Sequence, residues 1–187
     1  APYAVAVGGT TLTPDATGAR QSETTWVDDS ASAGTPCQNT WGSTGGLSVV
    51  PSFTVPSWQK GTGVSNQYSN GERQVPDVSA AAINISFYYT AIPGVQGLWL
   101  AVGGTSAAAP IWASGTDIVN QALAAKGKPA VGGVPTIYSL ANSSNYGSAF
   151  YDVTKGDNLF YKAGPGWDYV TGWGTPNFDK IASALGG

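Results

Sequence analysis

The sequence predicts an α/β domain in which helices flank a mainly parallel β-sheet. Short runs of β-branched and aromatic residues alternate with segments whose apolar residues recur at helical spacing. The chain has 187 residues, which is long enough for one domain with a buried core. Neither an internal repeat nor a linker divides it, so we expect residues 1–187 to form one domain or part of one.

The first half of the chain contains short strand-like segments separated by loops. Residues 3–7 are apolar and precede a pair of glycines, which predicts a short buried strand that ends at Gly8 and Gly9. Residues 14–72 are rich in Pro, Gly, Asn and Ser and predict loops. Two further strands are expected at residues 83–90 and 98–102.

The second half is dominated by helical patterns. Residues 105–125 carry apolar side chains at helical spacing, and Gly127 can end that helix. Pro110 falls near its first turn, where a missing N–H is tolerated best. We also expect a short helix at 135–141, a strand at 150–153 and a final helix at 176–185.

Composition restricts the classes of function. Charged residues make up 10% of the chain, against roughly 25% in ordinary soluble domains. The net charge of −3 argues against a nucleic-acid partner, and no stretch approaches the ~20 apolar residues that span a bilayer. An uncharged polar surface suits a secreted protein that tolerates acid. Cys37 is the single cysteine, so it is either free or paired outside this chain, and Ala1 is expected to be a processed or cut end.

A serine at the predicted start of the long helix is the first candidate functional residue. Gly103 and Gly104 permit a tight turn before Ser106, and a helix start offers free N–H groups to negative charge. These features suit a serine nucleophile, although a Thr-Ser pair at a helix start is also a common capping arrangement. The chain contains no histidine, so it cannot form a Ser-His-Asp triad by itself.

Two aspartates in a glycine-rich stretch form the second candidate site. Asp152 and Asp168 could hold a hard cation such as calcium, or they could simply cap turns. Arg73 and Asp77 are more consistent with a structural ion pair than with a catalytic pair. The tryptophans are expected to pack in the core and loops rather than form a sugar-binding platform.

Two Asn-X-Ser triplets fit the N-glycosylation pattern, at Asn84 and Asn142. Asn84 falls in a predicted strand, which leaves Asn142 as the candidate.

Several motifs, in order along the chain, carry a resemblance to a known family. The segment from Gly104 to Pro110 has a Gly-Thr-Ser sequence, then small residues, then proline. The chain resembles the sedolisins, or serine-carboxyl peptidases. They belong to the subtilisin-like clan but, unlike the subtilisins, use no catalytic histidine. The other matching segments are residues 2–9, 41–48, 56–59 and 73–79.

The resemblance implies a subtilisin-like α/β fold and a specific chemistry. Residues 1–187 would form the C-terminal portion of a single catalytic domain that hydrolyses protein or peptide substrates with Ser106 as nucleophile. In the family a Glu is the general base, one Asp orients it and another Asp lies beside the oxyanion, which favours acidic pH. Glu23 and Glu72 are the only glutamates, and neither has an Asp four residues on in a helical context. These partners are therefore expected on an N-terminal fragment of the same domain, and the isolated chain is expected to be inactive.

The resemblance also implies one calcium ion. Its ligands would be the side chains of Asp152 and Asp168 and the carbonyl oxygens of Val153, Gly164 and Gly166. The expected location is extracellular or a lysosome-like acidic compartment. The alternative is a non-catalytic secreted binding module that calcium stabilises.

Overall fold

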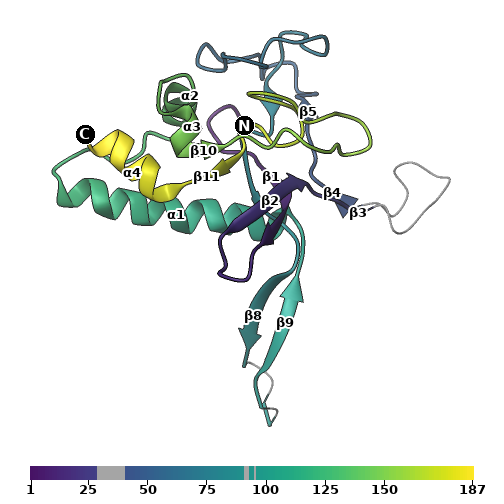
Figure 1. Ribbon diagram of the computed structural model, residues 1–187. Coiled ribbons are helices and arrows are strands. Elements are labelled where there is room, and N and C mark those ends of the chain that lie inside the picture. Colours follow the sequence, from purple (N-terminus) through teal and green to yellow (C-terminus); the bar gives the residue numbers. More distant parts are fainter. Residues whose placement is uncertain (29–40, 91–92, 95) are drawn as a thin grey trace.

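The computed structural model describes residues 1–28, 41–90, 93–94 and 96–187 (Figure 1). Its largest sheet has three strands in the order β2-β1-β7. The middle strand β1 (Val7–Pro14) pairs in parallel with β7 (Val78–Ala81) and antiparallel with β2 (Arg20–Thr25). Cys37 lies outside the described residues.

Four two-stranded ribbons complete the described β-structure, and all four are antiparallel. They pair β3 (Val27–Asp28) with β4 (Trp41–Gly42), β5 (Gly46–Leu47) with β6 (Gln74–Val75), β8 (Ile85–Tyr89) with β9 (Leu98–Val102), and β10 (Phe150–Tyr151) with β11 (Thr175–Pro176).

The expectation of a mainly parallel sheet is therefore not confirmed for the described part of the chain, which has one parallel pair. Parallel strands need a long crossover, whereas antiparallel strands can be joined by a short turn. Most strands here pair antiparallel, and β1 and β2 are linked by only a short turn. The long segment between β1 and β7 is the connection that permits parallel pairing.

The prediction of a first strand ending at Gly8 and Gly9 is also wrong, because β1 runs through both glycines. A Cβ atom on Gly8 would lie 2.7 Å from both Ser43 Oγ and the Val170 carbonyl oxygen. One on Gly9 would lie 2.7 Å from the Ala82 Cβ. The glycines thus permit close packing of neighbouring segments on a continuing strand.

The long helix α1 (Thr105–Ala125) has the bounds that the sequence predicts, and Gly127 follows its end with a φ of 67°. Its buried stripe packs against β1, β7 and α4 (Phe178–Gly186). The close approach of α4 requires Gly115, because a Cβ there would lie 2.1 Å from the Phe178 ring. The stripe consists of Ala108, Trp112, Gly115, Val119 and Leu123.

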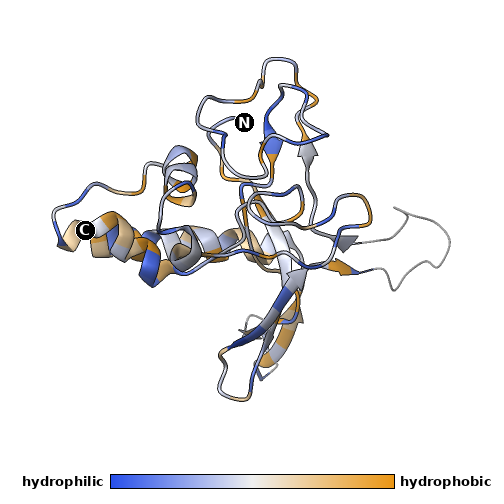
Figure 2. Cartoon of the chain, turned by 45° about the horizontal axis from the view of Figure 1, so that its top comes forward, coloured by the Kyte–Doolittle hydropathy of each residue, from blue (hydrophilic) through white to orange (hydrophobic). Residues whose placement is uncertain are grey.

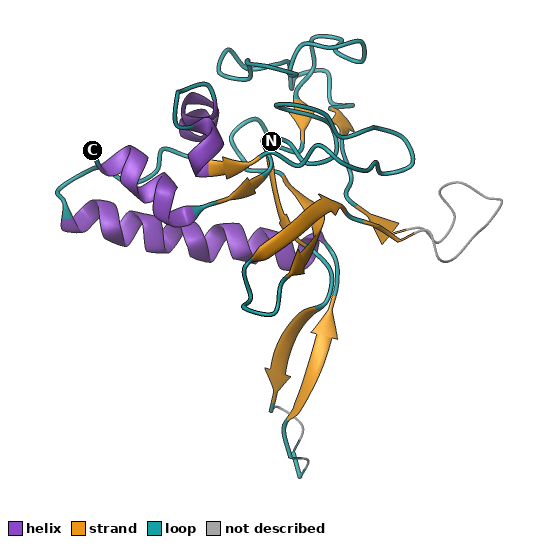
Figure 3. Ribbon diagram, viewed as in Figure 1, coloured by secondary structure: helices purple, strands orange, loops and turns teal. Residues whose placement is uncertain are grey.

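Two shorter helices, α2 (Val134–Ala141) and α3 (Tyr146–Ala149), lie above α4 in the view of Figure 3. The tryptophan prediction holds for Trp112, Trp167 and Trp173, which are buried in the core, whereas Trp41 and Trp99 are exposed. Among the described residues, no helix has the length and apolar character needed to cross a membrane.

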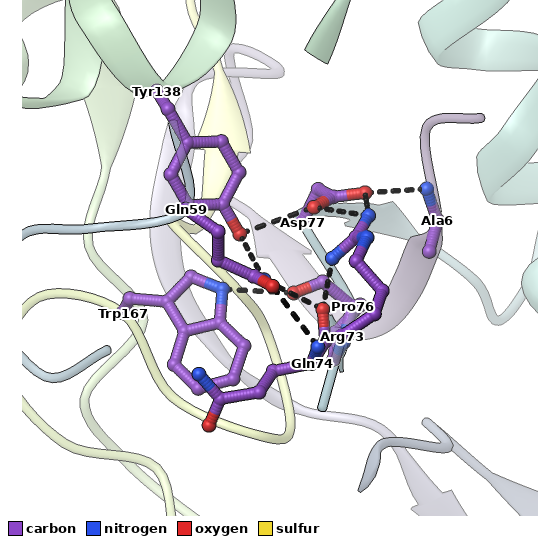
Figure 4. Close-up of polar contacts among 8 residues, drawn as sticks. All are labelled: Ala6, Gln59, Arg73, Gln74, Pro76, Asp77, Tyr138 and Trp167. Carbon is purple, nitrogen blue, oxygen red and sulfur yellow. Dashed lines mark hydrogen bonds and ion pairs between the residues drawn. The ribbon is translucent and has the colours of Figure 1, made fainter. Parts of the chain in front are cut away.

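A buried ion pair joins the elements that surround the sheet (Figure 4). Arg73 Nη2 lies 2.8 Å and 2.6 Å from the two carboxylate oxygens of Asp77, and both side chains are almost wholly buried. Asp77 also accepts hydrogen bonds from the Ala6 backbone N–H at 2.8 Å and from the Tyr138 hydroxyl at 3.1 Å. Burial raises the pKa of Asp77, and the Arg73 guanidinium opposes that rise. The predicted structural ion pair is confirmed.

Gln59 extends this network to the loop that precedes β6. Its side-chain amide donates to the Gln74 carbonyl oxygen at 2.7 Å and to the Tyr138 hydroxyl at 2.9 Å, and its oxygen accepts from the Gln74 N–H at 3.0 Å. Trp167 Nε1 donates to the Pro76 carbonyl oxygen at 2.9 Å. The buried polar groups that Figure 4 shows thus join the long loops to β7 and α2.

Replacing Arg73 by leucine should destabilise the chain strongly, because Asp77 would remain buried without its cation. We expect a loss of about 3–5 kcal/mol in the free energy of unfolding, measured by urea denaturation. The matched control is Lys180→Leu, since Lys180 forms an exposed ion pair with Asp179 at 3.5 Å. That change should cost about 0.5 kcal/mol or less, and equal losses in the two variants would contradict the assigned role of Arg73.

Candidate active site

Ser106 is the second residue of α1, directly after the turn that joins β9 to the helix. Gly104 has φ 121° and ψ 156°, a conformation that is readily available only to glycine. Its N–H donates to the Ala82 carbonyl oxygen at 2.6 Å, and its own carbonyl accepts from the Ala107 N–H at 2.9 Å. The turn is therefore held against the segment that follows β7, which gives Ser106 a defined position.

The side chain of Ser106 is exposed and makes no hydrogen bond to any described residue. The N-cap position is occupied by Gly104, and no side chain caps the helix. The capping interpretation of the Gly-Thr-Ser motif therefore has no support. The first N–H groups of a helix lack intrahelical partners and carry partial positive charge, and the first turn of α1 contains no acidic residue. Ser106 thus lies where negative charge is favoured.

The β8–β9 ribbon leads directly into this turn and projects from the body of the molecule (Figure 1). Its register pairs Ile85 with Val102 and Phe87 with Leu100, so apolar side chains share one face. Figure 2 shows both orange and blue strands in this part of the molecule, and the orange ones mark apolar residues. The exposed Trp99 lies on the other face, beside Tyr88 at a ring separation of 5.4 Å.

Neither of the two glutamates forms a hydrogen bond with Ser106. Glu23 is buried and accepts from Thr10 Oγ1 at 2.5 Å and Thr175 Oγ1 at 2.9 Å, with Arg20 Nε at 3.2 Å. The hydrogen bonds and the ion pair of this carboxylate connect β1, β2 and β11. Glu72 pairs through its backbone with Thr54 in the loop region, and no contact connects it to Ser106.

The second candidate site lies where β10 ends and a glycine-rich loop returns toward β11. Asp152 Oδ2 accepts from the Gly166 N–H at 2.8 Å, and Asp168 Oδ2 accepts from the Gly164 N–H at 3.0 Å. The Val153 carbonyl oxygen lies 3.4 Å from Thr171 Oγ1. Hydrogen bonds thus link Asp152 and Asp168 to Gly166 and Gly164 within one loop region, through the N–H groups of the glycines rather than their carbonyl oxygens.

The chemistry of this cluster fits a cation. Asp152 Oδ1 is buried and lacks a hydrogen bond of standard geometry, and the neighbouring Tyr146 hydroxyl partly offsets the effect of burial on the pKa of Asp152. Burial raises the pKa of Asp152 and raises that of Asp168 from 3.8 to about 6. No group of three or more Asp, Glu, His or Cys side chains occurs in the described residues, so backbone carbonyls would have to supply the remaining ligands. Calcium accepts such a mixture of carboxylate and carbonyl oxygens.

The turn-capping alternative explains part of this geometry. Asp168 Oδ1 accepts from the N–H groups of Val170 and Thr171, both at 2.8 Å, which is a side-chain cap of the following turn. It does not explain the buried Asp152 Oδ1, which lacks a hydrogen bond of standard geometry.

Sequence reasoning missed two residues at this cluster, Thr171 and Tyr146. The Thr171 hydroxyl lies 3.2 Å from both oxygens of Asp168, and the spacing Asp-X-X-Thr was the signal that could have indicated it. The pKa of Tyr146 is raised by burial first and then by the charges of Asp152 and Asp168, which indicates that its ring lies beside both carboxylates. No local sequence signal identifies Tyr146.

The ranking of the two glycosylation triplets is reversed by the structure. Asn142 is exposed, but its amide nitrogen donates to the carbonyl oxygens of Lys60 and Tyr138, both at 2.8 Å. Asn84 is not in a strand, since β8 begins at Ile85. It lies in an exposed bend with φ 57°. Asn84 is therefore the more accessible of the two side chains.

No family model matches the chain, but known proteins do. It is 37% identical over 195 residues to kumamolisin from Bacillus sp. (strain MN-32) and 36% identical over 194 residues to sedolisin from Pseudomonas sp. (strain 101). Each match covers 98% of this chain but only 31% and 29% of the respective relative. Human tripeptidyl-peptidase 1 is 31% identical over 132 residues, which is 65% of this chain and 22% of that protein.

A solved structure agrees with these relatives. Pseudomonas sedolisin, a serine-carboxyl proteinase complexed with two molecules of pseudo-iodotyrostatin, superposes with a TM-score of 0.72 at 31% identity. The match covers 97% of this chain and 45% of that chain. The present chain thus spans about a third of the length of the curated relatives it matches and slightly under half of the solved one.

The relatives named above define a class of protein, the serine-type peptidases. Within that class, the chain belongs to the sedolisin family and corresponds to the C-terminal part of its catalytic domain.

The turn before Ser106 can be tested separately from Ser106 itself. Gly104→Ala should lower the free energy of unfolding by about 1–3 kcal/mol, because alanine is strained at φ 121°. Ser106→Ala should stay within about 0.5 kcal/mol of the parent, since the exposed hydroxyl has no partner to lose. Thermal and urea denaturation measure both. A large loss in Ser106→Ala would instead indicate a structural role for the hydroxyl.

Proposed function

We propose that this chain is the nucleophile-bearing part of an acid-acting serine-carboxyl peptidase, with Ser106 as the nucleophile. The observation that carries the proposal is the state of this side chain: exposed, without a hydrogen bond, and held on a glycine turn at the start of a 21-residue helix. A serine that served only as a cap would be bonded to the backbone. The family relationship supports the same role.

In this reaction Ser106 Oγ attacks the carbonyl carbon of a peptide bond, and the carbonyl oxygen becomes an oxyanion. The C–N bond then breaks, the amine leaves with a proton, and water hydrolyses the acyl-serine ester. The free N–H groups at the start of α1 favour negative charge beside Ser106. The chain's own contributions are therefore the nucleophile, its position and part of the electrostatic environment.

The proton of Ser106 needs a base. The chain has no histidine, and the carboxylate of Glu23 is engaged by the hydroxyls of Thr10 and Thr175. An N-terminal fragment of the same domain, with a Glu and an Asp, would supply it. A carboxylate accepts a proton most usefully near its own pKa, which lies in the acidic range. An extracellular or lysosome-like acidic compartment is consistent with that requirement.

A bound calcium ion would be held by Asp152 and Asp168 together with the carbonyl oxygens of Val153, Gly164 and Gly166. Two partly desolvated carboxylates and the buried Asp152 Oδ1 support this part of the proposal. The ion would neutralise charge inside the fold and connect β10 to the loop before β11. Its role would be structural rather than catalytic.

The alternative function is a non-catalytic secreted binding module stabilised by calcium. The exposed Trp41 and Trp99 could contact a carbohydrate in such a module. They lie on two different ribbons, β4 and β9, and no described contact joins them. A binding module would not explain why Ser106 is exposed and free of hydrogen bonds, whereas a peptidase nucleophile would. The peptidase is therefore the better proposal.

The isolated chain should not hydrolyse peptides, because it lacks the base. Mixed with a polypeptide that contains the N-terminal part of a sedolisin-family catalytic domain, it should cleave a fluorogenic peptide at acidic pH. Ser106→Ala should reduce that activity by about 10³-fold or more, since the nucleophile is lost. Ser114→Ala, on the exposed side of the same helix, is the control and should keep full activity. Turnover by the isolated chain, or by the Ser106→Ala complex, would refute the proposal.

Calcium should stabilise the chain at neutral pH. At a hundredfold excess over its dissociation constant, an ion adds about 2.7 kcal/mol, which corresponds to about 5–10 °C in Tm for a chain of this size. Magnesium should do less, because it rarely accepts an all-protein set of ligands. Asp152→Asn should abolish the effect, and the exposed Asp179→Asn should not.

The pH dependence of that stabilisation has a definite sign. Because the pKa of Asp168 is raised from 3.8 to about 6, its protonated form is favoured in the metal-free fold, and this contribution to stability is lost as the pH rises through 6. Protons compete with the ion below that pH. The increase in Tm caused by calcium should therefore be larger at pH 7 than at pH 4. An equal increase in Tm at both values would argue against carboxylate ligands.

A further inference from the structure

The β8–β9 ribbon carries an exposed aromatic pair a short distance before Ser106. Tyr88 and Trp99 are directly opposite each other in the strand register, and their ring planes are inclined at 54°. The exposed fractions of the two residues are 51% and 73%. Both lie outside the segments whose motifs carry the family resemblance, so the pair is a feature of this chain rather than of those motifs.

The Tyr88 ring has a defined place on the ribbon because it packs across Gly97. A Cβ atom on Gly97 would lie 2.6 Å from Tyr88 Cζ, so a side chain there would displace the ring. Gly97 precedes Trp99 by two positions, and residues two apart on an extended chain face the same side. Tyr88 therefore lies against both. A pair that is already packed loses little conformational freedom when it binds a ligand.

The ribbon and the nucleophile belong to one packed unit. Strand β9 ends at Val102, and three residues separate it from Ser106 (Figure 1). In that turn the Gly104 N–H donates to the Ala82 carbonyl oxygen, and a Cβ on Gly103 would lie 3.0 Å from Ile83 Cδ1. The turn is thus fixed to the segment that leads into β8.

Trp99 precedes the end of β9 by three positions, which is about 10 Å along a strand. An extended peptide covers the same distance with about three residues. A peptide whose scissile bond lies at Ser106 can therefore bring a side chain to the aromatic pair.

The charge pattern around the pair selects the kind of side chain that fits. No charged residue occurs between Asp77 and Asp117, a stretch that includes the ribbon, the turn and the first half of α1. A charged side chain would lose hydration there without gaining an opposite charge from these segments. An aromatic or large aliphatic side chain would instead gain from covering the two rings.

We propose that Tyr88 and Trp99 determine substrate specificity by binding an aromatic or large aliphatic side chain of an extended peptide. That side chain would lie about three to five residues from the scissile bond, given the length of β9 between Trp99 and the turn. The inference rests on the proposed function and adds the preferred side chain of the substrate. The occupant is a peptide because the ribbon leads directly into the turn that holds Ser106. An uncharged lipid surface is the competing occupant, and the experiment separates the two.

The first test measures peptide hydrolysis by the chain in complex with the N-terminal polypeptide. A set of blocked peptides carries one Phe, moved one position at a time through an otherwise Ala/Ser sequence. At one position three to five residues from the scissile bond, Phe should raise kcat/KM about tenfold over Ser. Trp99→Ala should reduce that preference to about twofold or less, and Gly97→Ala should also lower it by displacing Tyr88. Trp41→Ala is the matched control, because Trp41 is 66% exposed on a different ribbon, and it should keep the full preference.

The second test measures contact without cleavage, because both rings belong to this chain. Fluorine NMR uses the isolated 187-residue chain labelled with 5-fluorotryptophan, and the Trp99 signal is assigned by its loss in Trp99→Phe. Millimolar Phe peptide should shift that signal, whereas the matching Ser peptide should not. The Trp41 signal should stay in place with both. An unchanged Trp99 signal, or equal shifts with the two peptides, would overturn the inference.

Vesicles of phosphatidylcholine alone test the competing lipid surface. The parent chain should co-sediment with them no more than Trp99→Ala does. Vesicle binding that Trp99→Ala abolishes, without a response of Trp99 to the Phe peptide, would replace the peptide by a membrane as the occupant.

The outcomes also separate this inference from the proposed function. A Trp99 signal that responds only to the Phe peptide, in a chain whose complex cleaves no peptide, supports the aromatic site and contradicts the peptidase. An active complex whose side-chain preference is unchanged in Trp99→Ala supports the peptidase and contradicts the aromatic site.

Discussion

The buried Arg73–Asp77 pair is the interaction on which the arrangement of this chain depends. Asp77 accepts from Arg73, from the backbone of Ala6 before β1 and from Tyr138 on α2, and Gln59 connects Tyr138 to the loops. An unpaired charge in such a place would cost several kcal/mol, so these partners have to be present together. Their assembly orients β7, and β7 with β1 supports the helix that begins at Ser106. The position of Ser106 thus depends on a buried polar network to which it makes no hydrogen bond.

In the proposed function, this chain contributes only part of a catalytic site. This chain supplies a hydroxyl, a rigid turn and the positive end of a helix, while the only buried glutamate, Glu23, is committed to Thr10, Thr175 and Arg20. A separate cluster at Asp152 and Asp168 is held by hydrogen bonds from the N–H groups of Gly166 and Gly164. In the proposed function, a carboxylate base completes the first site and a calcium ion completes the second.

Sequence reasoning succeeded where the determining contacts are local. The bounds of α1 follow from its apolar spacing and from Gly127, and the structural ion pair joins Arg73 and Asp77, opposite charges that lie close together in the sequence. It failed where a distant segment decides. Gly8 and Gly9 lie inside β1, where Ser43, Val170 and Ala82 approach them closely. The strand pairing is mostly antiparallel, and the sequence of a single strand does not reveal which distant strand it pairs with. The hydrogen bonding of the Asn142 side chain could not be predicted, because its amide nitrogen donates to the carbonyl oxygen of Lys60, which is distant in the sequence.

The central claim is that Ser106 is one half of an active site whose base lies on another polypeptide. A ¹³C-labelled peptide aldehyde tests it most directly, since addition forms a bond between Ser106 Oγ and the aldehyde carbon and transfers the serine proton to the aldehyde oxygen. We expect the NMR signal of a tetrahedral hemiacetal carbon at acidic pH only when the N-terminal polypeptide is bound, and never in Ser106→Ala. An adduct formed by the isolated chain, or one that persists in Ser106→Ala, would contradict the account.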